Sequence, residues 1–217
     1  MRNKNPAAPS SHVTFPTETT PVDVLRFWMG DDWPCDWPAA DRDDLWFKGG
    51  AAVDERIRQR FAADVTHAIE GGLSDWENDP HHRLALVLLL DQFTRNIHRG
   101  RPQAFAGDAR AQALVTDALT QRLDARLPVV GRLFMYMPLM HAEDLALQEE
   151  CVARFTVLQQ QAPAPLRDTL AGNLRYAILH RDIVARFGRF PHRNAALGRP
   201  STAEETAFLV DGPRFGQ

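Results

Sequence analysis

The chain has 217 residues, of which 44% are hydrophobic and 24% are charged, and its formal net charge at pH 7 is −3. A chain of this length can bury the core of one large helical domain, and its composition is that of an ordinary globular protein. The small net charge argues against a protein that wraps nucleic acid, so no nucleic-acid partner is expected.

Three features predict a cytoplasmic protein that has no contact with a membrane. Residues 1–20 are polar and lack the apolar stretch of a signal peptide or anchor, which predicts a flexible tail before a single domain over residues 21–217. The longest apolar run, residues 84–90, is too short to span a bilayer. Cys35 and Cys151 are far apart and form no CxxC motif, which is typical of free thiols in a reducing compartment.

The positions of apolar residues, prolines and glycines predict a series of helices. Thr20-Pro21-Val22-Asp23 combines the hydroxyl, proline and acid of a helix start. In chain order, helices are predicted over residues 21–30, 51–70, 79–98, 108–123, 128–137, 141–160 and 165–188, with a short last helix after Ser201-Thr202. Pro138 is expected to break the fifth of these. No stretch alternates with a period of two, so the sequence predicts an all-α fold of seven or eight helices in antiparallel pairs.

Charge is distributed unevenly along the chain. Residues 18–48 contain eight acidic and three basic residues, whereas residues 165–200 contain seven arginines and two aspartates. Either the two ends pack against each other, or the basic end faces an anion.

The first unusual stretch is residues 88–102, where polar residues continue an apolar helix. Asp91 and Arg95 would be one turn apart, at a spacing that allows an ion pair. Gln92 and Asn96 form a second polar line beside them. One interpretation is a solvated helix face. These residue types make directional hydrogen bonds, however, which favours a ligand-binding role for Asp91, Gln92, Arg95 and Asn96.

The second stretch is residues 137–150, which begins the predicted helix over residues 141–160. His141 would lie one turn before Leu145 on an inward apolar seam, with Gln148 on the same seam. Asp144 flanks this face, and Glu143 would point nearly opposite. A single buried histidine usually braces a neighbouring helix. Three polar groups on one face predict a lined cavity instead, because polar groups in an apolar seam cost free energy unless they are hydrogen-bonded.

The third stretch is residues 180–199, near the end of the predicted helix over residues 165–188. His180 lies at the edge of the apolar face of that helix. Beyond Gly188, the donors Arg189, His192, Arg193 and Asn194 follow one another in a predicted loop. Basic donors in a turn commonly hold a carboxylate or phosphate, although such loops also dock helices by binding backbone carbonyls.

At these stretches the sequence resembles a bacterial family catalogued as domain of unknown function 924. The matching strings are RFWMG (residues 26–30), LWF (45–47), LDQFTRNIHRG (90–100), FMYMPLMHAEDLALQ (134–148) and RFGRFPHRNAALGR (186–199). The family usually has proline at Thr94, tyrosine at His98 and serine at Ala142. The resemblance implies a tetratricopeptide-like helical array and no established activity.

Two functions fit these residues. In the first, a polar pocket between helices binds a small anionic metabolite, with Arg95 and Arg193 as anion contacts and His141, His180 and Asp144 as catalytic candidates. In the second, a non-catalytic tetratricopeptide-like scaffold binds an acidic peptide or protein. An interior pocket would favour the first, and an open groove would favour the second. The sequence does not settle whether the protein is an enzyme.

The sequence specifies no cofactor. A metal site of His141, Asp144 and His180 is a minor alternative, since no metal-ligand spacing motif is present. Haem ligation by one of the histidines also stays open, although the chain has no CxxCH motif for covalent attachment.

The free thiols give the first testable prediction. Both Cys35 and Cys151 should react with a thiol reagent after denaturation without reductant, because a reducing compartment keeps them unpaired. An intramolecular disulfide in protein prepared from cytoplasm would contradict this expectation.

Overall fold

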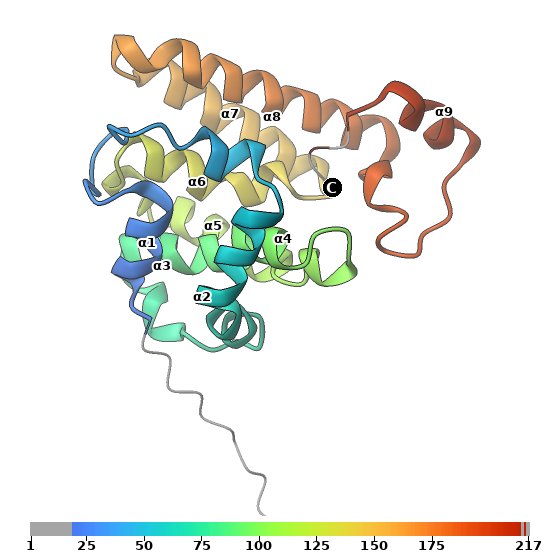
Figure 1. Ribbon diagram of the computed structural model, residues 1–217. Helices are drawn as coiled ribbons and strands as arrows, with labels where there is room; N and C mark the ends of the chain where they lie inside the picture. Colours follow the sequence, from blue (N-terminus) through green and yellow to red (C-terminus); the bar gives the residue numbers. More distant parts are fainter. Residues whose placement is uncertain (1–18, 214, 216–217) are drawn as a thin grey trace, which may run out of the picture.

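The computed structural model describes residues 19–213 and 215, and within them every regular element is a helix (Figure 1). The α-helices are α1 (Pro21–Met29), α2 (Ala51–Ile69), α3 (Pro80–Val87), α4 (Thr94–Ile97), α5 (Asp108–Thr120), α6 (Val129–Met140), α7 (Leu145–Gln161), α8 (Arg167–Phe187) and α9 (Ala203–Asp211). This confirms the predicted all-α class. Most of the predicted tail over residues 1–20 lies outside the described residues. None of the described helices has the length and apolar character needed to cross a membrane.

Several helix ends follow directly from the local sequence. Thr20 and Asp23 form a capping box at the start of α1, and Thr202 and Glu205 form another at the start of α9. Gly188 ends α8 in the left-handed conformation, with φ at 68°, which glycine adopts without steric cost. The prediction of these ends is therefore confirmed.

The predicted boundary between the fifth and sixth helices is wrong. Helix α6 continues through Pro138 to Met140, because the residues around this proline are buried and their packing offsets the lost hydrogen bond. His141 is the C-cap of α6, and α7 begins only after Asp144, whose carboxylate accepts a hydrogen bond from Leu147 N. His141 and Leu145 are consequently not on one helix seam, and Leu145 is 42% exposed.

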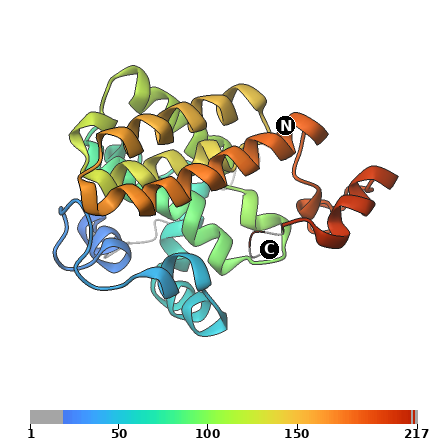
Figure 2. The ribbon, with the colours of Figure 1, turned by 90° about the horizontal axis from the view of Figure 1, so that it is seen from above.

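Helices α7 and α8 lie side by side and antiparallel, with α6 packed against α7 (Figures 1 and 2). The segment that contains α9 projects beyond one end of this pair. The main apolar core joins residues of α1 to α8. Its aromatic centre includes Phe93, whose ring centroid lies 5.3 Å from that of Trp28 and 4.9 Å from that of Phe61.

The helical run from Pro80 to Ile97 passes through the middle of the molecule. It is continuous, as predicted, but a π-helical turn at Leu88–Phe93 separates α3 from α4. Each residue over 84–90 is at most 1% exposed, so this run is enclosed on all sides. The interpretation of residues 91 and 95 as a solvated face is therefore wrong, since Asp91 is 0% exposed.

A smaller apolar cluster lies apart from the main core. It contains Ile183, Val184 and Phe190, with Phe208 and Phe215 packed against them. It holds the end of α8, the following loop, α9 and Phe215 together.

A close approach between Gly107 and the central run gives a prediction about stability. A Cβ at position 107 would collide with the carbonyl oxygen of Leu90, which belongs to the π-helical turn. Gly107→Ala should lower the free energy of unfolding by about 1–3 kcal/mol, measured by urea denaturation, because a packed backbone has no room for it. Gly172→Ala is the control, since its Cβ would meet only the Arg175 guanidinium at 3.7 Å. Equal stabilities of the two variants would contradict this account of the packing.

Candidate functional site

Asp91 is the centre of a buried set of charged side chains. Its carboxylate accepts hydrogen bonds from Arg95 Nη1 at 2.9 Å and from His141 Nδ1 at 2.8 Å. Gln92 Nε2 donates to the second carboxylate oxygen at 2.6 Å. The π-helical turn supplies Asp91, and such turns occur frequently at functional sites.

The ion pairs continue from Arg95 to the C-terminal part of the chain. Arg95 Nη2 lies 2.9 Å from Asp108 Oδ1, and Arg193 Nη1 lies 3.4 Å from Asp108 Oδ2. Arg193 Nη2 also donates to the His141 carbonyl at 2.9 Å. We call Asp91, Arg95, Asp108, His141 and Arg193 the charged network. It joins the central helical run, the start of α5, the end of α6 and the turn Pro191–Arg193.

The charges of this network shift the pKa values of its members. Burial raises the pKa of Asp91, but Arg95 and His141 outweigh it and hold that pKa at about 2. Burial raises the pKa of Asp108 above its ordinary value, and the nearby Asp91 carboxylate adds to this rise. Burial and Arg95 lower the pKa of Arg193 to about 10, so its guanidinium is still charged at neutral pH.

His141 is held in one protonation form. Because the Asp91 carboxylate is ionised, His141 Nδ1 carries the hydrogen of their hydrogen bond. Burial lowers the pKa of His141, which favours the neutral ring at pH 7. Its Nε2 atom makes no hydrogen bond within the described residues, and the side chain is 17% exposed. The site thus presents an unprotonated imidazole nitrogen.

Arg193 is buried with donor capacity left over. Its guanidinium carbon lies 4.6 Å from the ring centroids of both Phe105 and Phe190, which enclose it. Its Nε atom is buried without a hydrogen-bond partner in the described part of the chain, and its contact with Asp108 is long. Buried donors normally have partners, so this guanidinium is unusual.

Two further predicted histidines lie next to the charged network. The ring centroid of His180 lies 6.3 Å from that of His141, and its Nδ1 bonds the Tyr176 carbonyl at 2.7 Å. Phe215 stacks on His180 with a centroid distance of 3.9 Å and also contacts the ring of His192. Burial lowers the pKa values of both His180 and His192 to about 3.

The structure corrects the predicted position of five other site residues. Asp144 is exposed and caps α7. Gln148 is buried and donates to the carbonyls of Met140 and Ala142. Asn96 donates to Asp54 of α2, as Arg99 does. Arg189 and Asn194 both bond Glu205. These contacts brace the fold, so the predicted residues do not all converge on one cavity.

Three members of this region were not predicted from the sequence. Asp108 is an acid at the start of a predicted helix, and neither it nor Phe105 was among the predicted site residues. Glu143 was expected to point away, yet it binds Arg199 at 2.6 Å and accepts a hydrogen bond from Phe190 N at 2.8 Å. Only knowledge of which helices are neighbours would have placed these residues.

Two other observations bear on what the region holds. No group of three or more histidine, cysteine or acidic side chains suited to a metal ion occurs among the described residues. Two cavities lie elsewhere on the molecule, and none of the predicted site residues lines either of them. The charged side chains described above bind one another, while Arg193 Nε and His141 Nε2 make no hydrogen bond within the described residues.

The buried histidines predict how stability depends on pH. In the folded protein the pKa values of His180 and His192 are about 3, below the value of 6.5 expected for an unfolded chain. The unfolded state therefore binds more protons below pH 6.5, and stability should fall as the pH is lowered from 6.5 towards 3. Each such histidine contributes a slope of about 1.4 kcal/mol per pH unit in this window.

His180→Asn should reduce this slope by about the contribution of one histidine, measured by urea unfolding at several pH values between about 6.5 and 4.5. The comparison of parent and variant at each pH removes the contribution of the carboxylates, which both proteins share. An unchanged slope would mean that His180 is not held neutral in the folded protein.

Comparisons with known proteins place the chain in a family. A search of curated proteins finds no match. A solved structure of a protein of unknown function from Agrobacterium tumefaciens is similar, with 35% sequence identity and a TM-score of 0.72 over 88% of this chain and 97% of that chain. Residues 24–213 match the family described as bacterial protein of unknown function, DUF924, which confirms the resemblance seen in the sequence. The chain belongs to the DUF924 family.

Proposed function

We propose that the protein binds a small anionic molecule beside His141, and that His141 transfers a proton to or from it. One observation carries this proposal. A buried carboxylate fixes the tautomer of a partly exposed histidine, next to a buried arginine with unused donors. Such combinations of shifted pKa values and close charged partners are concentrated at functional sites.

The chemistry follows from the two nitrogens of His141. Nδ1 donates to Asp91, and the neutral Nε2 is free to accept a proton from water or from a bound molecule. The Asp91 carboxylate would stabilise the imidazolium that forms, as the aspartate of a catalytic triad does. We therefore infer general acid–base chemistry at Nε2 of His141.

Arg193 is the group that would hold the anion. Among the residues that the structure describes, its Nε atom lacks a partner, and its one carboxylate contact, with Asp108, is 3.4 Å long. A bound oxyanion would accept a hydrogen bond from Nε and so satisfy the donor that lacks a partner. The raised pKa of Asp108 allows that carboxyl to take up a proton as the anion binds. Arg95 is less available, because both Asp91 and Asp108 bind it.

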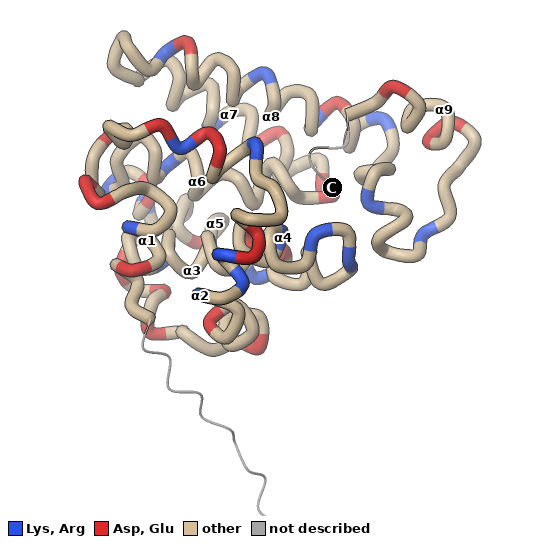
Figure 3. The backbone as a smooth tube through the Cα atoms, viewed as in Figure 1, with Lys and Arg blue, Asp and Glu red and all other residues tan. Residues whose placement is uncertain are grey.

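The alternative, a scaffold for an acidic peptide, has less support. Basic and acidic positions are interspersed along α8, and acidic positions of α9 follow the basic segment that leads to it (Figure 3). Arg186, Arg189 and Arg199 each pair with a glutamate of this chain. Because these positive charges are neutralised internally, little of the basic segment is left to attract an acidic partner.

We infer that this function belongs in the cytoplasm. Cys35 and Cys151 are both unpaired, and burial raises the pKa of the Cys151 thiol, which lowers its reactivity.

The test uses succinate, a small dicarboxylate, as the probe anion. Succinate should raise the melting temperature of the parent protein in a saturable way, because a ligand that binds only the folded state stabilises it. Arg193→Gln should stay folded and lose this rise. The control is Arg186→Gln, since Arg186 is exposed and pairs with Glu204 away from the charged network. It should keep the full rise.

One combination of results would contradict the proposed function. If succinate does not affect the parent, and Arg193→Gln and His141→Gln both melt much earlier than the parent, the charged network serves only to hold the C-terminal segment in place.

A further inference from the structure

Three arginines surround a cavity at the end of α6 opposite to His141. The cavity has a volume of about 250 Å³ and lies between the connection from α5 to α6 and the second half of α7. Arg122, Arg132 and Arg154 line it, together with Tyr136. We call it the arginine pocket. Its lining includes no member of the charged network, so it is separate from the proposed function.

The positive charge of this pocket is only partly compensated, by Asp124 in its lining and by Glu150 beside Arg154. Arg122 is exposed, and its side chain pairs with no described residue. Arg132 donates only to the uncharged carbonyls of Leu127 and Ala125, at 3.0 Å each. Arg154 is the exception, because it bonds Glu150 at 2.7 Å. Two of the three arginines therefore have no carboxylate partner in the part of the chain that the structure describes.

One acid, Asp124, lines the pocket. It is buried, its carboxylate accepts a hydrogen bond from the Tyr136 hydroxyl at 2.7 Å, and it lies 4.0 Å from Arg154 Nη1. Burial and Asp124 raise the pKa of Tyr136, while Arg132 and Arg154 act in the opposite direction. Arg132 and Arg154 thus lie near the same hydroxyl group, and both line the pocket.

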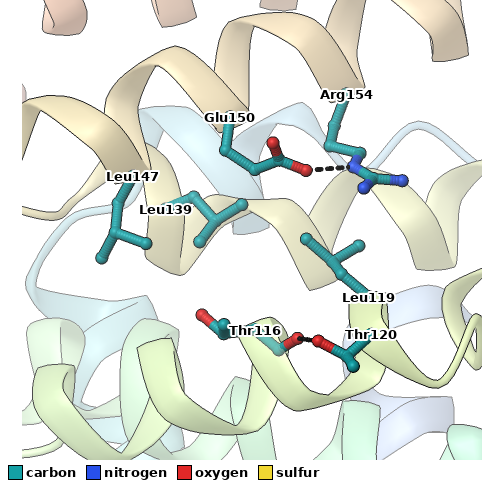
Figure 4. A pocket seen from close by; sticks show the side chains of 7 residues that line it. All are labelled: Thr116, Leu119, Thr120, Leu139, Leu147, Glu150 and Arg154. Carbon is teal, nitrogen blue, oxygen red and sulfur yellow. Dashed lines mark hydrogen bonds and ion pairs between the residues drawn. The ribbon is translucent and has the colours of Figure 1, made fainter.

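A second cavity, of about 210 Å³, adjoins the first and shares Arg154 with it. Figure 4 shows it between α5 and α7, with Leu119, Leu139 and Leu147 around it and the Glu150–Arg154 ion pair at one side. It offers an apolar surface next to the arginines. Both volumes are smaller than the roughly 300–1,000 Å³ of sites for drug-sized ligands, which restricts the occupant to a small molecule.

We propose that the arginine pocket binds a small organic phosphate monoester. A phosphate monoester carries a charge of about −1.5 to −2 at pH 7, which matches the two unpaired guanidinium groups. Its oxygens would accept hydrogen bonds from Arg122 and Arg132, since arginine recognises phosphate by such charge-assisted bonds. Its organic part would lie against the leucines of the adjoining cavity.

The experiment is a calorimetric titration of the full chain with phenyl phosphate. The parent should bind it saturably, and more tightly than inorganic phosphate, which lacks an apolar part. Arg122→Asn should weaken binding roughly tenfold or more, the size of effect expected for one charge-assisted hydrogen bond. Asparagine suits this position, because residue 122 has a φ of 57° and asparagine tolerates the left-handed conformation. Arg122→Lys should retain part of the affinity.

The matched control is Arg126→Asn. Arg126 is an exposed arginine on the same connection, but it does not line the pocket. The Arg126→Asn variant should therefore keep the parent's affinity. Three results would overturn the proposal. These are no saturable binding by the parent, equal losses in the Arg122 and Arg126 variants, and loss of binding in Arg193→Gln with none in Arg122→Asn. The last result would place the phosphate in the charged network, so the two proposals fail in different ways.

Discussion

The fold around the proposed site depends on keeping one carboxylate ionised where water does not reach it. Asp91 is 0% exposed, and a lone buried charge of this kind would cost several kcal/mol. Arg95 offsets that cost with its opposite charge, and Arg95 and His141 both donate hydrogen bonds to the carboxylate of Asp91. The same carboxylate fixes the ring of His141. The contacts that stabilise the buried charge of Asp91 therefore also leave Nε2 of His141 as a basic nitrogen.

The charged network also connects two parts of the molecule that have separate apolar contacts. The main core reaches Ala177 in the middle of α8, whereas a small cluster around Phe190 holds the C-terminal segment. Between them, Arg193 reaches Asp108 and the His141 carbonyl, and Arg199 reaches Glu143. Polar contacts thus dock the C-terminal segment beside His141. A molecule bound at Arg193 would act on this docking directly.

The sequence was sufficient to predict the helices, because caps, prolines and glycines mark their ends locally. It also singled out Asp91, Arg95, His141 and Arg193, which lie together. The predicted place of His141, at the start of a helix over residues 141–160, was wrong, since His141 ends α6 instead of starting α7. An error of a few residues in a helix boundary reverses which side chains share a face. The roles of Asp108 and Glu143 depend on which helices are neighbours, and spacing along the chain holds no information about that.

The most direct test of the central claim is ¹⁵N nuclear magnetic resonance of the histidine rings at neutral pH. The account predicts that the neutral ring of His141 carries its proton on Nδ1 and leaves Nε2 unprotonated. Asp91→Asn should abolish this strong preference and lower the pKa of His141, because the carboxylate that favours the protonated ring is gone. A proton on Nε2 in the parent, or a tautomer that does not respond to Asp91→Asn, would contradict the account.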